Sequence, residues 1–246
     1  MKLNQLITLF GFLCLAEASA AEVHVAVAAN FAGPIEKIAA AFERDTGHKL
    51  SVAVGSTGKF YAQIHAGAPF EVLLAADDET PKKLVGEGIA IAASEFTYAR
   101  GTLVLWSAKP GLIDAHGAVL KNGTYAHLAI CNPKLAPYGL AAVETMKALG
   151  LYESLKPKLV EAENIAQTYQ FTATGNAELG FVALSQVIPL GSKTHYWVVP
   201  ENLHTPIQQD AVLLKKGEAN PAAAAFLKYL RGEAARAVIL SYGYRI

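Results

Sequence analysis

The segment VHVAVAANFAGPIEKIAAAFERDTG, residues 23–47, decides the fold class. Its apolar start predicts a buried strand over 23–28. Apolar side chains then recur at helical spacing from Pro34, which suits a first helical turn, to Asp45. Gly47 is typical of the residue that ends a helix. A strand followed directly by a helix is the repeating unit of an α/β protein.

The same alternation continues along the chain and predicts an α/β fold. Strands are expected at 50–54, 72–75, 103–106, 128–131, 179–183 and 196–199, and helices at 58–66, 80–86, 140–149 and from Pro221 onward. Two lobes suit this pattern better than one long sheet, each lobe having a mainly parallel sheet flanked by helices. We expect residues 21–101 plus 207–246 in lobe 1 and 102–206 in lobe 2, with strands crossing near 98–102 and 203–208.

The first twenty residues differ from the rest. Lys2 precedes an apolar run that is too short to span a bilayer, and the run ends in Ala18-Ser19-Ala20. This pattern predicts a secretory signal peptide, residues 1–20, cleaved after Ala20, and a periplasmic protein. The exported chain keeps Cys131 as its one cysteine, so an intramolecular disulfide is excluded, and we expect Cys131 to be a small buried strand residue.

Charge excludes several classes of partner. The 246 residues carry 21 Lys+Arg and 21 Asp+Glu, and 52% are hydrophobic. A neutral chain without a basic patch gives no electrostatic case for nucleic acid, and no basic run favours an anionic membrane. The seven histidines show no metal-binding spacing, and no G-x-S-x-G motif supports a hydrolase, so we expect neither a metal site nor an enzyme.

Three expected strand-to-helix junctions, 28–34, 54–59 and 132–139, combine small residues with hydroxyl or amide side chains. Ligands of open α/β sheets bind at the carboxyl ends of the strands. Helix starts there present unpaired N–H groups and a partial positive charge. None of the three junctions contains Asp, Glu or Arg, so they favour a dianion with no proton to donate.

The composition of these junctions fits two other interpretations. Asn30, Ser56 and Thr57 are residue types that commonly cap helices, so each could serve structure alone. The run Gly55 to Lys59 also suggests a nucleotide loop, but it lacks the upstream glycine and has Phe60 where a P-loop needs Ser or Thr.

At these junctions the chain resembles the periplasmic molybdate-binding proteins, the ModA family of ABC importer subunits. The resemblance covers nearly the whole exported chain, and its best segments are 26–30, 55–64 with 67–69, 132–139 and 162–165. It implies a two-lobed periplasmic-binding-protein fold that closes around an oxyanion, molybdate or tungstate, with no cofactor. Molybdenum would be bound only as the oxyanion. The implied partner is an ABC transporter permease in the membrane, and we expect a monomer.

The resemblance also implies the oxyanion ligands. The family's positions fall on Asn30, on Thr57 with Ser56 adjacent, on Tyr138, and on the backbone N–H of Ile165. Some members have a binding tyrosine where this chain has Ala183. Either Tyr138 supplies that hydroxyl from the opposite loop, or the site has one hydrogen bond fewer. The alternatives are another anion on the same scaffold, such as sulfate, phosphate or a small organic acid, and a periplasmic enzyme.

Overall fold

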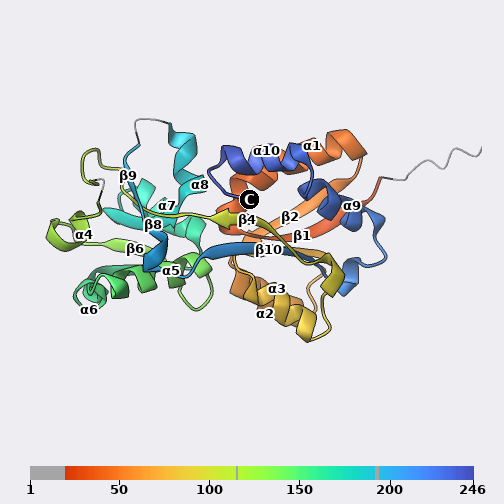
Figure 1. Cartoon of the computed structure of the whole chain (residues 1–246), viewed down its shortest axis with the longest axis horizontal. Helices are drawn as coiled ribbons and strands as arrows, with labels where there is room; N and C mark the ends of the chain where they lie inside the picture. The colour runs from red at the N-terminus through yellow and green to blue at the C-terminus, as the bar shows by residue number, and fades with distance from the viewer. Residues whose placement is uncertain (1–19, 115, 192–193) are drawn as a thin grey trace, which may run out of the picture.

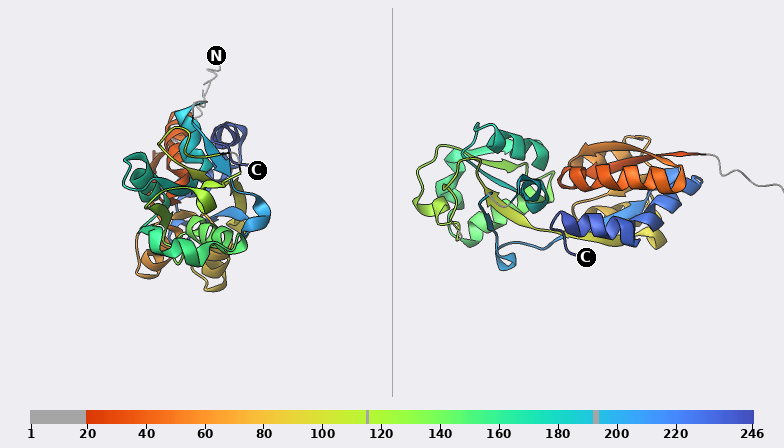
Figure 2. Two further views of the ribbon diagram at one scale, coloured as in Figure 1. Left: turned by 90° about the vertical axis from the view of Figure 1, so that its left-hand side faces the viewer. Right: turned by 90° about the horizontal axis from the view of Figure 1, so that it is seen from above.

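The computed structural model describes residues 20–114, 116–191 and 194–246. Apart from Ala20, the predicted signal peptide lies outside the described residues. Two five-stranded sheets lie end to end along the long axis of the molecule, and helices cover both (Figures 1 and 2). The two-lobed α/β fold expected from the sequence is confirmed.

The first sheet has the strand order β2-β1-β3-β10-β4. Its strands are β1 (Glu22–Ala28), β2 (Lys49–Gly55), β3 (Val72–Leu74), β4 (Phe96–Gly101) and β10 (Ile207–Leu213). Its helices are α1 (Ala32–Thr46), α2 (Thr57–His65), α3 (Glu79–Gly86), α9 (Pro221–Leu230) and α10 (Glu233–Ser241), with 3-10 turns η1 (Ala29–Phe31), η2 (Ala92–Ser94) and η6 (Lys215–Gly217). Figure 1 shows α1, α9 and α10 on one face of the sheet and α2 and α3 on the other.

The apolar residues of segment 23–47 build one face of this lobe. Ile35, Ile38 and Phe42 are buried in the cluster that joins α1 to β1, α9 and α10. The Phe42 ring meets Phe226 of α9 edge to face, with centroids 5.6 Å apart. Gly47 ends α1 at φ +76°, a left-handed conformation that suits glycine. The strand and helix predicted from this segment are therefore confirmed.

The second sheet has the order β7-β6-β8-β5-β9. Its strands are β5 (Leu103–Trp106), β6 (Leu128–Cys131), β7 (Leu159–Ala162), β8 (Leu179–Ala183) and β9 (Tyr196–Val198). Its helices are α4 (Val119–Asn122), α5 (Pro137–Ala148), α6 (Tyr152–Leu155), α7 (Ile165–Ala173) and α8 (Leu184–Val187), with 3-10 turns η3 (Lys156–Lys158), η4 (Ile188–Leu190) and η5 (Glu201–Leu203). Cys131 is fully buried in β6, as predicted.

Both sheets are mixed, with two parallel and two antiparallel strand pairs each, where mainly parallel sheets were expected. Three strands of each sheet run parallel, β2-β1-β3 and β7-β6-β8. The other strands pair antiparallel, β10 with β3 and β4, and β5 with β8 and β9. The antiparallel pairs involve the chain segments that pass between the sheets, which strand–helix alternation alone does not reveal.

The chain passes between the two sheets twice. β4 ends at Gly101 and β5 begins at Leu103, while β9 ends at Val198 and β10 begins at Ile207. Both passages lie where the sequence predicted crossings. None of the helices in the described ranges has the length and apolar character of a membrane span; the longest, α1, has 15 residues.

Candidate functional site

A small cavity of about 10 Å³ lies between the two sheets, where several strands end and helices begin. That volume is on the scale of one water molecule, so a larger anion fits only if the two sides of the cavity part slightly. Its lining comes from both sheets: Ala28, Ala29, Asn30, Gly55, Ser56, Thr57, Ala76, Ala136, Pro137, Tyr138, Asn164 and Ile165. All five predicted site residues therefore line one cavity.

Four helix starts converge on this cavity. η1 begins directly after β1, α2 after Ser56, α5 at Pro137 and α7 after Asn164. The first N–H groups of a helix have no partner within it, and they carry the positive end of the helix dipole. The tight turns after the strands bring these ends together, and the result is a site suited to a small anion.

The hydroxyl of Ser56 is the clearest unused donor at the cavity. Ser56 occupies the N-cap position of α2, yet its side chain makes no capping bond. Its Oγ is buried and has no hydrogen-bond partner in the part of the chain that the structure describes. A buried hydroxyl without a partner costs about 1–3 kcal/mol, so a ligand that accepts from it gains correspondingly.

Thr57 is placed differently from its neighbour. Its Oγ1 accepts a hydrogen bond from the Ala76 N–H, at 3.0 Å. That bond ties the start of α2 to the end of the β3 segment. The interpretation of Ser56 and Thr57 as ordinary helix caps is wrong, because neither hydroxyl bonds the N–H groups of its own helix.

Asn30 does not act as a helix cap either. Its side-chain Nδ2 donates to Gln209 Oε1 at 2.8 Å and to the Tyr244 hydroxyl at 2.9 Å. Both of its side-chain N–H groups are thereby used inside the protein. The backbone N–H groups of Ala29 and Asn30 precede the first hydrogen bond of η1, and they border the cavity.

Tyr138 and Ile165 face the cavity from the second sheet. Tyr138 follows Pro137 at the start of α5, so its backbone N–H precedes the first bond of that helix. The Tyr138 hydroxyl lies beside Gly101, and it accepts a long 3.4 Å bond from Gln209 Nε2. Ile165 begins α7, which Asn164 caps by accepting from the Gln167 N–H at 3.0 Å.

The electrostatics of the cavity favour an anion. None of its twelve lining residues has an ionisable acid or base as its side chain except the Tyr138 phenol. Burial raises the pKa of Tyr138 well above its ordinary value, so the phenol stays neutral. The positive ends of the four helices are therefore balanced by no carboxylate in the lining.

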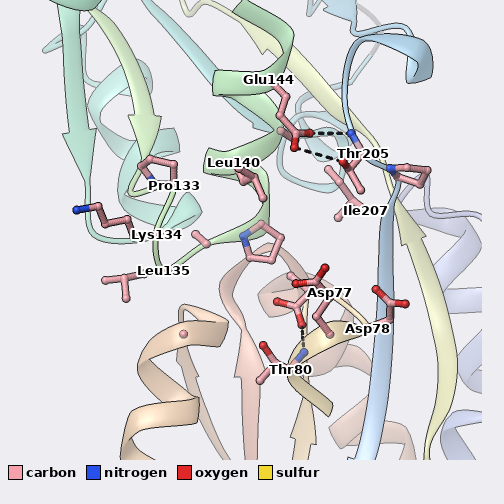
Figure 3. Close-up of a pocket in the computed structure, with 17 residues that line it drawn as sticks. Asp77, Asp78, Thr80, Pro133, Lys134, Leu135, Leu140, Glu144, Thr205 and Ile207 are labelled. Atoms are coloured by element: carbon pink, nitrogen blue, oxygen red, sulfur yellow. Dashed lines mark hydrogen bonds between the residues drawn. The ribbon is translucent and has the colours of Figure 1, made fainter. Parts of the chain in front are cut away.

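A larger pocket of about 380 Å³ adjoins the cavity and shares Ala76, Ala136 and Pro137 with it (Figure 3). Its lining includes Asp77, Asp78, Glu79 and Glu144, with Lys134 as the one basic residue. In Figure 3, Asp77 accepts from the Thr80 N–H and Glu144 accepts from Thr205. These carboxylates disfavour an anion, so we assign the functional site to the small cavity.

Several contacts join the two sides of the cavity. The Gly58 N–H donates to the Leu135 carbonyl at 2.9 Å, and Lys59 forms an ion pair with Glu163. Small apolar residues from both sides, including Ala29 and Ala136, share one buried cluster. The structure therefore has the two sheets closed on each other around the cavity.

Four residues near the site were not predicted. Gln209, Tyr98, Ser185 and Tyr244 are buried and hydrogen-bonded to one another or to Asn30. Gln209 lies fully buried in β10, where a buried amide needs partners, but the polar run Gln208 to Asp210 gave no sign in the sequence of a buried strand. No pattern in the sequence indicates a role for Ser185 or Tyr244, because the residue to which each bonds lies 155 or 214 residues away.

Within the described residues, no three His, Cys, Asp or Glu side chains gather closely enough to hold a metal ion.

Comparison with known proteins gives a consistent result. Residues 23–245 match the family described as bacterial extracellular solute-binding protein. The chain is 59% identical over 245 residues to the molybdate-binding protein ModA of Azotobacter vinelandii, covering 98% of this chain and 97% of that protein. It is 54% identical to the molybdate-binding protein ModA of Rhodobacter capsulatus, covering 92% of this chain and 89% of that protein.

Comparison with a solved structure indicates the same family. The periplasmic molybdate-binding protein of Azotobacter vinelandii superimposes with a TM-score of 0.88 at 42% identity, covering 91% of this chain and 99% of that one. The family description is of extracellular proteins, in agreement with export. The chain therefore belongs to the bacterial extracellular solute-binding protein family and, within it, to the ModA proteins.

Proposed function

We propose that this protein captures molybdate between its two lobes and delivers it to an ABC transporter permease. The observation that carries the proposal is the convergence of four helix starts and the partnerless Ser56 hydroxyl on one small cavity without charged side chains. Two relatives named as molybdate-binding proteins, 59% and 54% identical, support this ligand. Like these relatives, the protein would bind its ligand without converting it.

The proposed oxyanion site has five residues. Ser56 donates its hydroxyl, and Thr57 donates the N–H at the start of α2. Asn30 contributes through its backbone N–H, because its side-chain N–H groups are already donated to Gln209 and Tyr244. Tyr138 and Ile165 contribute the N–H groups at the starts of α5 and α7. On this proposal the donor missing at Ala183 is replaced by Ser56 and backbone groups rather than by the Tyr138 hydroxyl.

The donor set favours a fully ionised oxyanion. A partly protonated phosphate needs an acceptor for its proton, and none of the lining residues has a carboxylate. Organic acids usually take a bidentate arginine, and the lining has none. We propose that size separates molybdate from the smaller sulfate, and that tungstate, similar in size to molybdate, binds as well.

We further propose the lobe boundaries 21–101 plus 207–246 and 102–206. Sheet membership supports them, because β1–β4 and β10 form one sheet while β5–β9 form the other. The exported protein would begin at Ala21 after signal-peptide cleavage and act as a monomer in the periplasm. Intact-mass measurement of the secreted protein, together with its size in solution, tests these points.

Thermal unfolding with molybdate, tungstate, sulfate or phosphate, each in excess, tests the ligand. A ligand at about 1,000 times its Kd adds about 4 kcal/mol to the free energy of unfolding. We expect a large rise in Tm with molybdate and tungstate and little with the other two. A rise led by sulfate or phosphate would keep the scaffold and overturn the ligand. No rise with any of the four would overturn the anion site.

A further inference from the structure

We propose that Ser185, Gln186 and Tyr244, named here the α8 bridge, are positioning residues that join the two anion-binding loops when the lobes close. Two of them belong to the four-residue helix α8 and the third to the C-terminal tail. None of the three lines the cavity. The inference rests on the proposed function, since it assigns how the closed oxyanion site is held.

Ser185 reaches across from the second sheet to the first. Its Oγ donates to the backbone carbonyl of Asn30 at 2.8 Å. Both residues are buried, Ser185 at 6% and Asn30 at 3% relative exposure. The bond joins α8, which follows β8, to η1, which follows β1, so we expect it to break when the lobes separate.

Gln186 holds the anion-binding loop of its own lobe. Its Nε2 donates to the Ile165 carbonyl at 3.1 Å, and its Oε1 accepts from the Ala183 N–H at 3.0 Å. One amide therefore fixes the start of α8 to the start of α7. Consecutive side chains of one short helix thus hold the loop of Ile165 and the loop of Asn30, which lie on opposite sides of the cavity.

Tyr244 completes the bridge from the C-terminal tail. Its hydroxyl donates to the Asn30 carbonyl at 2.7 Å, accepts from Asn30 Nδ2, and lies 3.1 Å from Ser185 Oγ. The Asn30 carbonyl thereby accepts from one donor of each lobe. When the lobes separate, Tyr244 would keep its bonds to Asn30, whereas the contact of its hydroxyl with Ser185 and the bond from Ser185 to Asn30 would be lost.

The tail itself lies close against the second lobe. A Cβ at Gly243 would come within 2.4 Å of the Ile188 side chain and 2.9 Å of the Leu184 side chain, and its φ of +79° is a left-handed conformation that suits glycine. Arg245 forms an ion pair with Glu201, and its backbone pairs with that of Arg100 in β4. The tail is therefore a third connection between the lobes, beside the two crossing segments.

This placement predicts a kinetic signature. Molybdate enters the open protein before Ser185 meets Asn30, so the association rate does not depend on that bond. Dissociation requires the closed state to open and the bond to break. Losing a buried hydrogen bond of this kind corresponds to about a tenfold change in equilibrium. We expect that change in the dissociation rate.

The test compares stopped-flow molybdate binding in the exported protein and in Ser185→Ala and Tyr244→Phe. Ser154→Ala and Tyr229→Phe are matched controls, because their hydroxyls bond within one lobe, to the Leu151 carbonyl and to Asp45. We expect both bridge variants to dissociate about tenfold faster with association rates within about twofold of wild type. The controls should match wild type.

Ligand-free thermal unfolding separates positioning from a general structural role. For Ser185→Ala we expect the ligand-free Tm of the Ser154→Ala control together with faster dissociation. Dissociation rates unchanged in both bridge variants, or association slowed as much as dissociation is accelerated, would overturn the proposal. If wild type binds no molybdate, the proposed function fails instead, and the same rates are measured with the oxyanion that raises the wild-type Tm.

Discussion

The side chain of Ser56 gives the most direct indication of where a ligand binds. Its buried hydroxyl lacks a partner among the described residues and borders a cavity formed by helix starts. The side-chain oxygen of its neighbour Thr57 accepts a hydrogen bond from the Ala76 N–H. Two adjacent hydroxyls therefore have different roles, one toward a ligand and one toward the protein.

We predict that Ser56→Ala weakens oxyanion binding about tenfold or more, because a donor to a charged acceptor contributes about 1.5–3 kcal/mol. The ligand-free stability should hold, since the variant also removes an unsatisfied buried group. Titration calorimetry and urea unfolding measure the two effects. Thr57→Val is the comparison: it should lower the ligand-free stability, because it leaves the Ala76 N–H without its partner. The reverse pattern would contradict both assignments.

The carboxyl group of Asp77 should make the stability of the protein depend on pH. Burial raises its pKa to about 6, in spite of the hydrogen bond from Thr80. The unfolded carboxyl has an ordinary pKa of 3.8. The folded state holds the proton of Asp77 more tightly than the unfolded state does. The resulting contribution to the free energy of unfolding is fully present below pH 4 and is lost as pH rises through 6.

The size of this effect is about 3 kcal/mol of unfolding free energy, from 1.36 kcal/mol per unit of pKa. We predict that Asp77→Asn removes this decline between pH 4 and 6 while keeping an oxygen for the Thr80 N–H. Urea unfolding of both proteins across pH 4–7 measures it. Parallel pH profiles for wild type and Asp77→Asn would contradict the prediction.

At the scale of the element, the starts of the helices supply the N–H groups of the proposed oxyanion site. α7 illustrates how a cap positions an N–H group. Asn164 accepts from the Gln167 N–H, which fixes the first turn and leaves the Ile165 N–H free at the cavity. The same turn is held from outside by Gln186, through the Ile165 carbonyl.

We predict that Asn164→Ala costs about 1 kcal/mol of stability, the usual value for losing a cap, and also weakens oxyanion binding. Asn220→Ala is the control for binding, because Asn220 caps α9 through the Ala222 N–H, and α9 does not begin at the cavity. It should lose more stability in urea unfolding than Asn164→Ala, because the Asn220 amide also donates to the Glu22 carbonyl and to Glu71 Oε1. Equal losses of oxyanion affinity in the two would contradict the role of α7.

At the scale of the whole molecule, closure depends on small residues at the lobe interface. Gly58 comes so close to the other lobe that a Cβ there would lie 3.0 Å from Leu135 Cα and 3.1 Å from its oxygen. The Gly58 N–H donates to that same oxygen. A methyl group at this position would act on closure rather than on either core.

We predict that Gly58→Ala weakens molybdate binding at least tenfold, because backbone on the far side cannot yield as a flexible side chain would. Ligand-free stability should hold or rise by up to about 1 kcal/mol, since Gly58 lies in α2 and alanine is the better helix former. Small-angle scattering with and without molybdate should show reduced contraction. Full contraction with wild-type affinity would contradict the prediction.

Some helices and strands could be predicted from the sequence and others could not. The strand and helix of residues 23–47 followed from apolar spacing, and so did most of the other elements before Leu149. β10 was not predicted as a strand, because Gln208, Gln209 and Asp210 interrupt its apolar residues. Gln209 is nevertheless fully buried, and its amide is satisfied by Asn30 and Tyr98, two residues far away in the chain.

The sequence by itself predicted the two α/β lobes and three of the loops that line the cavity, because strand and helix periodicity and helix-start composition are local properties. The fourth loop, that of Ile165, was predicted only from the family resemblance. Only the tertiary structure decided which group each residue offers. Asn30 turns its amide inward, Ser56 keeps a free hydroxyl, and Ser185 reaches Asn30 across the lobes. Those outcomes depend on partners distant in sequence, and local patterns contain no information about them.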